Sequence, residues 1–270
     1  MPRLLHCRVA LSLAVLAASC IITSSVIQSY PVASGTDSER LRAIAGHPLI
    51  NVENGSVKYT GALTPEGLSQ LKALTSGRAI SDLTIASGGG EVSISIDFGN
   101  WVYDHQLSVI VERACMSSCA NYIFPAGKRK VILPGAVVAW HGSPLQRNLQ
   151  SESGMRKQLR AADREAQKRV TREELEKAVK EMMVFMADVK EKQKAFYERI
   201  GVNEYVTRIG NEKYGARGFY FMSVEDMEKF GIKNVTAPND YPKVDLTELN
   251  KLMPLPVRYI KLRNAGITSR

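Results

Sequence analysis

Apolar and polar positions follow two kinds of pattern between residues 56 and 140. Short apolar or alternating runs predict strands, and apolar residues that recur every three or four positions predict helices. Strands are expected at 56–62, 80–86, 107–111, 130–133 and 137–140, with helices beginning at Thr64, Val92 and Ser118. This alternation of strand and helix indicates an α/β fold with a largely parallel sheet.

The pattern changes between residues 151 and 200, where 23 of 50 residues are charged, 13 basic and 10 acidic. Thr171 and Glu174 form a capping box, and the apolar positions behind them predict one long amphipathic helix over 171–200. A shorter helix is expected over 154–168. The long helix either packs on its own domain or projects to contact another subunit, which would make the protein a homo-oligomer. Residues 219–232 then predict a strand followed by a capped helix that ends at a glycine.

The N-terminus has the pattern of an export signal. Residues 1–8 are basic, and residues 9–27 carry no charge. Nineteen uncharged residues could also remain as a single membrane anchor, and Cys20 lies in a sequence that partly resembles a lipoprotein box. In each case the chain beyond about residue 30 is expected outside the cytoplasm, in a bacterial periplasm or anchored to the membrane and facing it.

The expected organisation has six parts. These are a signal peptide or membrane anchor (1–30), a linker (31–50), an α/β core (51–145), a charged helical extension (146–200), the C-terminal part of the core (201–245) and a basic tail (246–270).

Composition narrows the possible classes of function. Apolar residues make up 44% and charged residues 23% of the chain, which excludes wholesale disorder. The net charge is +9, from 36 basic and 27 acidic residues, but the basic residues are spread along the chain instead of clustering. Nucleic-acid binding is therefore not expected. No pattern indicates a metal or an organic cofactor.

Two cysteines, Cys115 and Cys119, lie beyond the N-terminal segment. In an oxidising compartment such a pair predicts a disulfide. Two ligands alone do not form a zinc site, and no histidine lies at finger spacing from them.

Three features that could carry chemistry occur within 55 residues. Ser87–Gly90 is a glycine turn at a strand end, where backbone N–H groups can approach a ligand closely. Cys115–Cys119 contains two serines at the start of a short helix. His141 ends an apolar strand. Their order is a glycine turn, a serine and a histidine.

In this order the sequence resembles the proteolytic subunit of the Clp protease in the ClpP/crotonase superfamily, and especially its exported relatives. That family has a strand ending in Ser-x-Gly-Gly, a nucleophilic serine that opens a helix, an Ala-Gly pair eight and nine residues later, and a strand ending in histidine. The matching residues here are Ser87–Gly90, Ser118, Ala126, Gly127 and His141. The likeness covers 56–144 and, more loosely, 196–232. It implies a ClpP/crotonase-like fold of repeated ββα units in a superhelix, with a long helical insertion.

The resemblance implies an exported serine peptidase that acts on peptides or proteins. Ser118 would be the nucleophile and His141 the general base, with Gly89 or Gly90 and Cys119 donating backbone N–H groups to the oxyanion. A Cys115–Cys119 disulfide would then fix the turn that presents the nucleophile. Ser117 is the competing nucleophile, and Ser118 is preferred because its spacing to Ala126 and Gly127 matches the family. Relatives usually assemble as trimers or stacked rings.

One position departs from the family. Phe219 stands where the family has the aspartate that orients the histidine, and Asn211 and Glu212 are the nearest polar substitutes. A serine–histidine dyad retains part of the catalysis. A serine–lysine dyad, as in related signal peptide peptidases, would instead use one of three lysines: Lys128, Lys130 or Lys213. Two other classes stay open: a catalytically degenerate member that binds peptides or partner subunits, and thioester chemistry of the crotonase type.

Overall fold

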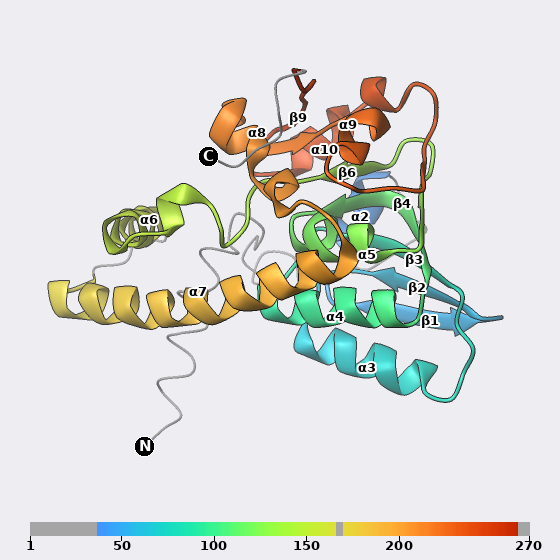
Figure 1. The fold of residues 1–270 in the computed structure, drawn as a ribbon, viewed down its shortest axis with the longest axis horizontal. Helices are drawn as coiled ribbons and strands as arrows, with labels where there is room; N and C mark the ends of the chain where they lie inside the picture. The colour runs from blue at the N-terminus through green and yellow to red at the C-terminus, as the bar shows by residue number, and fades with distance from the viewer. Residues whose placement is uncertain (1–36, 166–169, 264–270) are drawn as a thin grey trace.

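A mixed sheet of mostly parallel strands forms the centre of the protein (Figure 1). The computed structural model describes residues 37–165 and 170–263. Its strands are β1 (Leu49–Glu53), β2 (Ser56–Thr60), β3 (Asp82–Ser87), β4 (Ser108–Met116), β5 (Arg129–Ile132), β6 (Val137–Ala139), β7 (Phe219–Phe221), β8 (Val235–Thr236) and β9 (Val257–Tyr259). Seven of them pair in the order β1-β2-β3-β4-β5-β8, with β6 also on β4, and β7 pairs with β9 separately. β1 and β2 pair antiparallel, the other strand pairs of the described residues are parallel, and a single antiparallel bridge joins Trp140 to Tyr220.

Helices surround this sheet and extend away from it on one side (Figure 1). The α-helices are α2 (Asp37–Ala43), α3 (Pro65–Thr75), α4 (Val92–Asp104), α5 (Phe124–Ala126), α6 (Glu152–Glu165), α7 (Arg172–Ile200), α8 (Ile209–Lys213), α9 (Val224–Glu228) and α10 (Thr247–Leu252). A π-helix η1 (Cys119–Ile123) precedes α5, and 3-10 turns occur at η2 (Arg147–Leu149), η3 (Glu204–Thr207) and η4 (Tyr241–Lys243). The predicted α/β class and the long helix are confirmed.

The two ends of the described chain contain more structure than the sequence pattern indicated. The expected linker, 31–50, includes α2 and the start of β1, and the last thirty residues include α10 and β9. These strands are short and lie at sheet edges. Leu49 of β1 is 63% exposed, so the strand lacks the apolar face that a pattern search detects. The predicted signal or anchor at 1–30 lies outside the described residues. Among the described residues, no helix is long and apolar enough to span a membrane.

A bend in β4 determines where the strand ends lie. Ile85 of β3 pairs with Val111, but Ser87 pairs with Cys115. Between these two pairs the chain moves four positions along β4 and only two along β3, which is a β-bulge in β4. Such a bulge bends a strand. The first half of β4 therefore pairs with β5, and its last three residues, Ala114–Met116, pair with β6. The C-terminal ends of β3, β4 and β6 consequently meet at one edge of the sheet.

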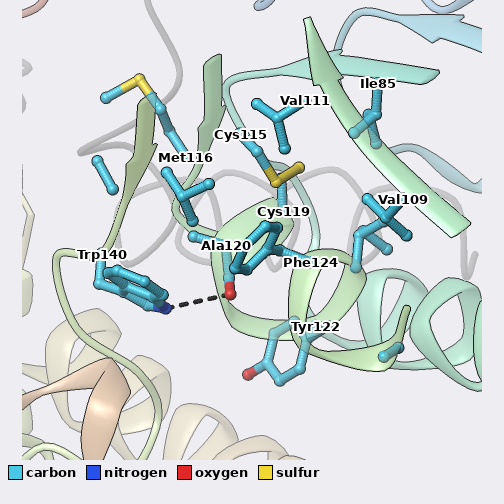
Figure 2. Close-up of a cluster of buried hydrophobic side chains, with 14 of the residues drawn as sticks. Ile85, Val109, Val111, Cys115, Met116, Cys119, Ala120, Tyr122, Phe124 and Trp140 are labelled. Atoms are coloured by element: carbon cyan, nitrogen blue, oxygen red, sulfur yellow. Dashed lines mark hydrogen bonds between the residues drawn. A yellow bond between two sulfur atoms is a disulfide. The ribbon is translucent and has the colours of Figure 1, made fainter. Parts of the chain in front are cut away.

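The core lies directly beneath this edge (Figure 2). Cys115 and Cys119 join there in a disulfide, next to Ile85 and Val111, and all four residues are fully buried. Trp140 packs in the same cluster and donates its Nε1–H to the carbonyl of Ala120 at 3.1 Å. Buried apolar side chains thus support both the end of β4 and the end of β6.

Helices α6 and α7 form a hairpin that projects from the sheet (Figure 1). The predicted capping box begins α7, because the Thr171 hydroxyl accepts from the Glu174 N–H and the Glu174 carboxylate accepts from the Thr171 N–H. The N-terminal half of α7 packs with α6 in a small cluster of its own. Its members are Leu149, Met155, Leu159, Leu175, Val179, Met182 and Met186. The C-terminal half, including Phe196, joins the main core beside α4. The helix therefore both packs on its own domain and projects from it.

Candidate active site

The glycine turn after β3 is held by a set of backbone contacts. Gly88 donates its N–H to the carbonyl of Ile44, Gly89 donates to the Ser87 hydroxyl, and the Gly89 carbonyl accepts from Leu63. Gly89 has φ +102, a conformation that favours glycine. A side chain at Gly89 would lie 2.8 Å from the Cβ of Ser117. The turn therefore lies in close contact with the serine segment.

The serine segment is a sharp turn between β4 and η1. Ser117 has φ +53, which is unusual for a residue other than glycine. Its N–H donates to Ala139 of β6, and its carbonyl accepts from the N–H of Asn121. The Cys115–Cys119 disulfide closes a five-residue loop around it. Strained backbone of this kind clusters at active sites, and serine nucleophiles on strand-to-helix turns are one example.

The structure pairs His141 with Ser117 and not with Ser118. The Ser117 Oγ lies 2.6 Å from the His141 Nε2. The Ser118 hydroxyl points to the glycine turn instead, where it donates to the Gly90 carbonyl at 2.9 Å. The expectation that His141 would act on Ser118 is therefore corrected to Ser117, and Ser118 becomes a contact that holds the glycine turn.

A π-helix lies between the serine segment and the Ala126–Gly127 pair whose spacing favoured Ser118. A π-helix contains more residues per turn than an α-helix, commonly as one inserted residue, and such insertions are frequent at functional sites. Ser117 is nine and ten residues before Ala126 and Gly127, one more than the family spacing. The π-turn of η1 lies between them. It accommodates the extra residue, so a count along the sequence selects Ser118 whereas the fold places Ser117.

His141 is uncharged at neutral pH. The residue as a whole is partly exposed, but its imidazole ring is enclosed, and this burial lowers the pKa of His141 to about 4. The ring is therefore neutral at pH 7, and its Nε2 can accept the Ser117 proton if Nδ1 carries the ring hydrogen. The ring of Phe219 packs against it, with ring centroids 4.5 Å apart. Phe219 is thus in contact with the histidine, at the place where the family has an aspartate.

The expected oxyanion donors differ in their hydrogen bonds. Leu63 bonds to the residues on either side of Gly90, namely the Gly89 carbonyl and the Glu91 N–H. In a parallel ladder this directs the N–H and the C=O of Gly90 away from Leu63. The Gly90 carbonyl lies on the side of the serine turn, where it accepts from Ser118. The Gly89 N–H is bound to the Ser87 hydroxyl.

The polar residues expected to replace the acid differ in their roles. Asn211 lies next to the histidine and donates its Nδ2–H to the His141 backbone carbonyl at 2.5 Å. Glu212 accepts from Arg208 at 2.9 Å and from the N–H of Arg147 at 3.0 Å. Asn211 therefore contacts the histidine through its backbone, while Glu212 belongs to an ion-pair cluster.

The three lysines do not form a dyad with Ser117. Lys130 is buried at the start of β5, where its Nζ donates to the carbonyls of Gly127 and Lys233, and burial lowers its pKa to about 8. It pairs in register with Val109, eight positions before Ser117. Because the bulge of β4 takes up two of these positions, the separation is roughly 20 Å along the strand. Lys128 lies at the same end of the sheet, and Lys213 is exposed at the end of α8.

Asn121 is a site residue that sequence reasoning missed. It lies in η1 and donates its Nδ2–H to the Gly142 carbonyl at 3.0 Å. An asparagine inside a short helix has no pattern that indicates such a contact. Within residues 37–165 and 170–263, no three His, Cys, Asp or Glu side chains lie close enough together to hold a metal ion.

No model of a known protein family matches the chain, and no curated protein matches it in sequence.

Proposed function

We propose that this protein is an exported serine hydrolase in which Ser117 is the nucleophile and His141 the general base. One observation carries the proposal. The Ser117 hydroxyl, on a backbone of positive φ, lies 2.6 Å from a neutral imidazole and beside a glycine turn. A nucleophile, a base and adjacent backbone donors are the parts that acyl transfer needs.

The reaction would follow from this geometry in two halves. The Ser117 Oγ attacks the substrate carbonyl as its proton passes to the His141 Nε2. The N–H groups of Gly90 and Ser118 stabilise the oxyanion. His141 then gives the proton to the leaving group, and the acyl chain stays on Ser117. Water, deprotonated by His141, attacks the acyl-serine, and the proton returns to Ser117 as the acid leaves.

The choice of peptides or proteins as substrates rests on the resemblance to the Clp proteolytic subunit, as does the finer assignment of a ClpP/crotonase-like fold. Export is supported by the Cys115–Cys119 disulfide, because disulfides persist in oxidising compartments. Assembly through α7 is part of the same proposal. Its support is an exposed apolar side chain on α7: Val184 is 74% exposed, and contact with a second copy would bury it.

One observation favours a second function. Phe219 contacts the ring of His141 where the family has a carboxylate. A chain that kept the fold but lost catalysis would use the same site to bind peptides.

Labelling with a fluorophosphonate probe decides between the two. We expect the oxidised wild type to be labelled on Ser117, as located by fragment-ion mass spectrometry. Labelling should disappear in Ser117→Ala and in His141→Gln and persist in Ser118→Ala. Label that persists in Ser117→Ala and disappears in Ser118→Ala would overturn the assignment. A folded, unlabelled wild type would favour the binding function. Cleavage of quenched fluorescent peptides, compared with simple esters and thioesters, then tests the substrate class.

A further inference from the structure

The segment that carries His141 is held at three consecutive residues. Trp140 pairs with Tyr220, each donating its N–H to the other's carbonyl at 2.8 and 2.7 Å. The carbonyl of His141 then accepts from Asn211, and the carbonyl of Gly142 accepts from Asn121. Side-chain amides therefore bind the two carbonyls that follow the end of the strand.

These bonds restrict a part of the chain that would otherwise turn easily. Gly142 has φ +136, which glycine adopts more readily than other residues. Rotation about the His141–Gly142 backbone would move the imidazole relative to Ser117. The two amides restrict this rotation because each binds one of the carbonyls. They come from distant parts of the chain: Asn121 precedes Gly142 by 21 residues, and Asn211 follows His141 by 70.

Both amides occupy these positions at an energetic cost. The Oδ1 atoms of Asn121 and Asn211 are buried, and neither has a hydrogen-bond partner among the described residues. A buried polar atom without a hydrogen-bond partner lowers the stability of the folded state. An apolar side chain of similar size would avoid this cost but would leave the carbonyl that the asparagine binds without a donor. These two effects oppose each other, so the two asparagines at these consecutive peptide groups contribute little net stability.

Asn121 also connects the histidine to the nucleophile. It lies in η1, and its backbone N–H donates to the carbonyl of Ser117 at 2.8 Å. Its side chain meanwhile holds Gly142. A single residue thus fixes the turn that presents Ser117 and the segment that presents His141.

We infer that Asn121 and Asn211 are positioning residues that hold His141 against Ser117 by binding the backbone carbonyls of His141 and Gly142. The inference rests on the proposed function, in which the pairing of Ser117 with His141 is what the reaction needs. In the proposed site, amides bind the backbone that carries the histidine, and the Phe219 ring packs on the imidazole.

The test uses Asn121→Leu and Asn211→Leu in the full chain, because leucine has a similar size but neither the donor nor the unpaired oxygen. The matched control is Asn100→Leu. It removes an amide of α4 whose oxygen accepts a hydrogen bond from Arg199 of α7. Three quantities are measured: the thermal midpoint, the rate of fluorophosphonate labelling, and the ¹⁵N shifts and pKa of the His141 ring by NMR. The chain has four histidines, so His141→Gln assigns the His141 signals.

We expect each site variant to unfold close to the wild-type temperature, because the loss of the unpaired oxygen offsets the carbonyl that is left without its donor. Each should nevertheless be labelled about 10- to 100-fold more slowly. The pKa of His141 should rise toward its ordinary value as the ring leaves its place. Asn100→Leu should change neither the rate nor the ring. Unchanged labelling and unchanged His141 signals in both site variants would overturn the inference. If the wild type is not labelled at all, the proposed function fails, but the NMR result still decides whether the amides position His141.

Discussion

Replacing Gly89 by alanine tests whether the glycine turn sets the position of the nucleophile. The new Cβ would lie 2.8 Å from the Cβ of Ser117 and 2.9 Å from both the Met116 carbonyl oxygen and the Ser118 nitrogen. Favourable contacts between such atoms begin near about 3.5 Å. The turn or the serine segment must therefore shift by roughly 0.6 Å. None of these atoms lies at the end of a flexible side chain that could swing away.

The energetic cost has two parts. A non-glycine residue in strained backbone costs about 1–3 kcal/mol, and overpacking in a buried site adds about 1–3 kcal/mol. The free energy of unfolding should thus fall by about 2–6 kcal/mol, against a total of about 5–15 kcal/mol for an ordinary domain. The same shift lengthens the 2.6 Å contact between Ser117 and His141. Misplacement on this scale slows a reaction by up to about 100-fold.

Gly77→Ala is the matched control for Gly89→Ala. Gly77 also has a positive φ, +69, but no atom lies within 4 Å of the Cβ that alanine would add. We expect Gly77→Ala to cost about 1 kcal/mol and to leave fluorophosphonate labelling unchanged. Both variants are compared by urea unfolding and by labelling rate at matched fractions of folded protein. Wild-type labelling of folded Gly89→Ala, or an equal loss of labelling in Gly77→Ala, would refute the reasoning.

Three further predictions follow from the same site and from the hairpin. Because the folded pKa of His141 is about 4 and the unfolded value is near 6.5, the unfolded state binds more protons between these pH values. The free energy of unfolding is therefore expected to decrease as the pH falls from about 6.5 to about 4, and to decrease less in His141→Gln. The labelling rate of the wild type should stay high down to about pH 4. Half-maximal labelling near pH 6.5 would contradict this expectation. Replacing Cys115 and Cys119 by alanine removes the cross-link that closes a five-residue loop. The free energy of unfolding, measured in urea, should fall by about 2 kcal/mol. It should also slow labelling at least about tenfold, and an undiminished rate would show that the disulfide does not hold the turn. Met155→Ala removes a fully buried side chain from the hairpin cluster and should cost about 2–5 kcal/mol there. Hydrogen exchange should then increase in α6 and the N-terminal half of α7 alone, with labelling unchanged; faster exchange throughout the sheet would argue against a separate cluster.

Much of the architecture could be predicted from local patterns. The strands at 80–86 and 107–111 are apolar runs, and α7 is marked at its start by Thr171 and at its end by Gly201, which has φ +66. Strand runs, caps and stops depend on neighbours within a few residues, so they can be identified without the fold. The edge strands β1 and β9 could not, because their pairing partners supply most of what stabilises them.

The candidate site also has a part that the sequence predicts and a part that only the fold reveals. The sequence by itself determined that a glycine turn, a serine pair and a histidine follow the ends of strands, because composition and order along the chain are enough to show this. Only the tertiary structure decided which serine meets His141, since the turn at Ser117, with φ +53, directs the Ser117 hydroxyl to the imidazole and leaves the Ser118 hydroxyl on the Gly90 carbonyl. It also brought Asn121 and Asn211, 90 residues apart in the sequence, to two consecutive peptide groups. Such contacts arise from packing between distant elements, and no local pattern encodes them.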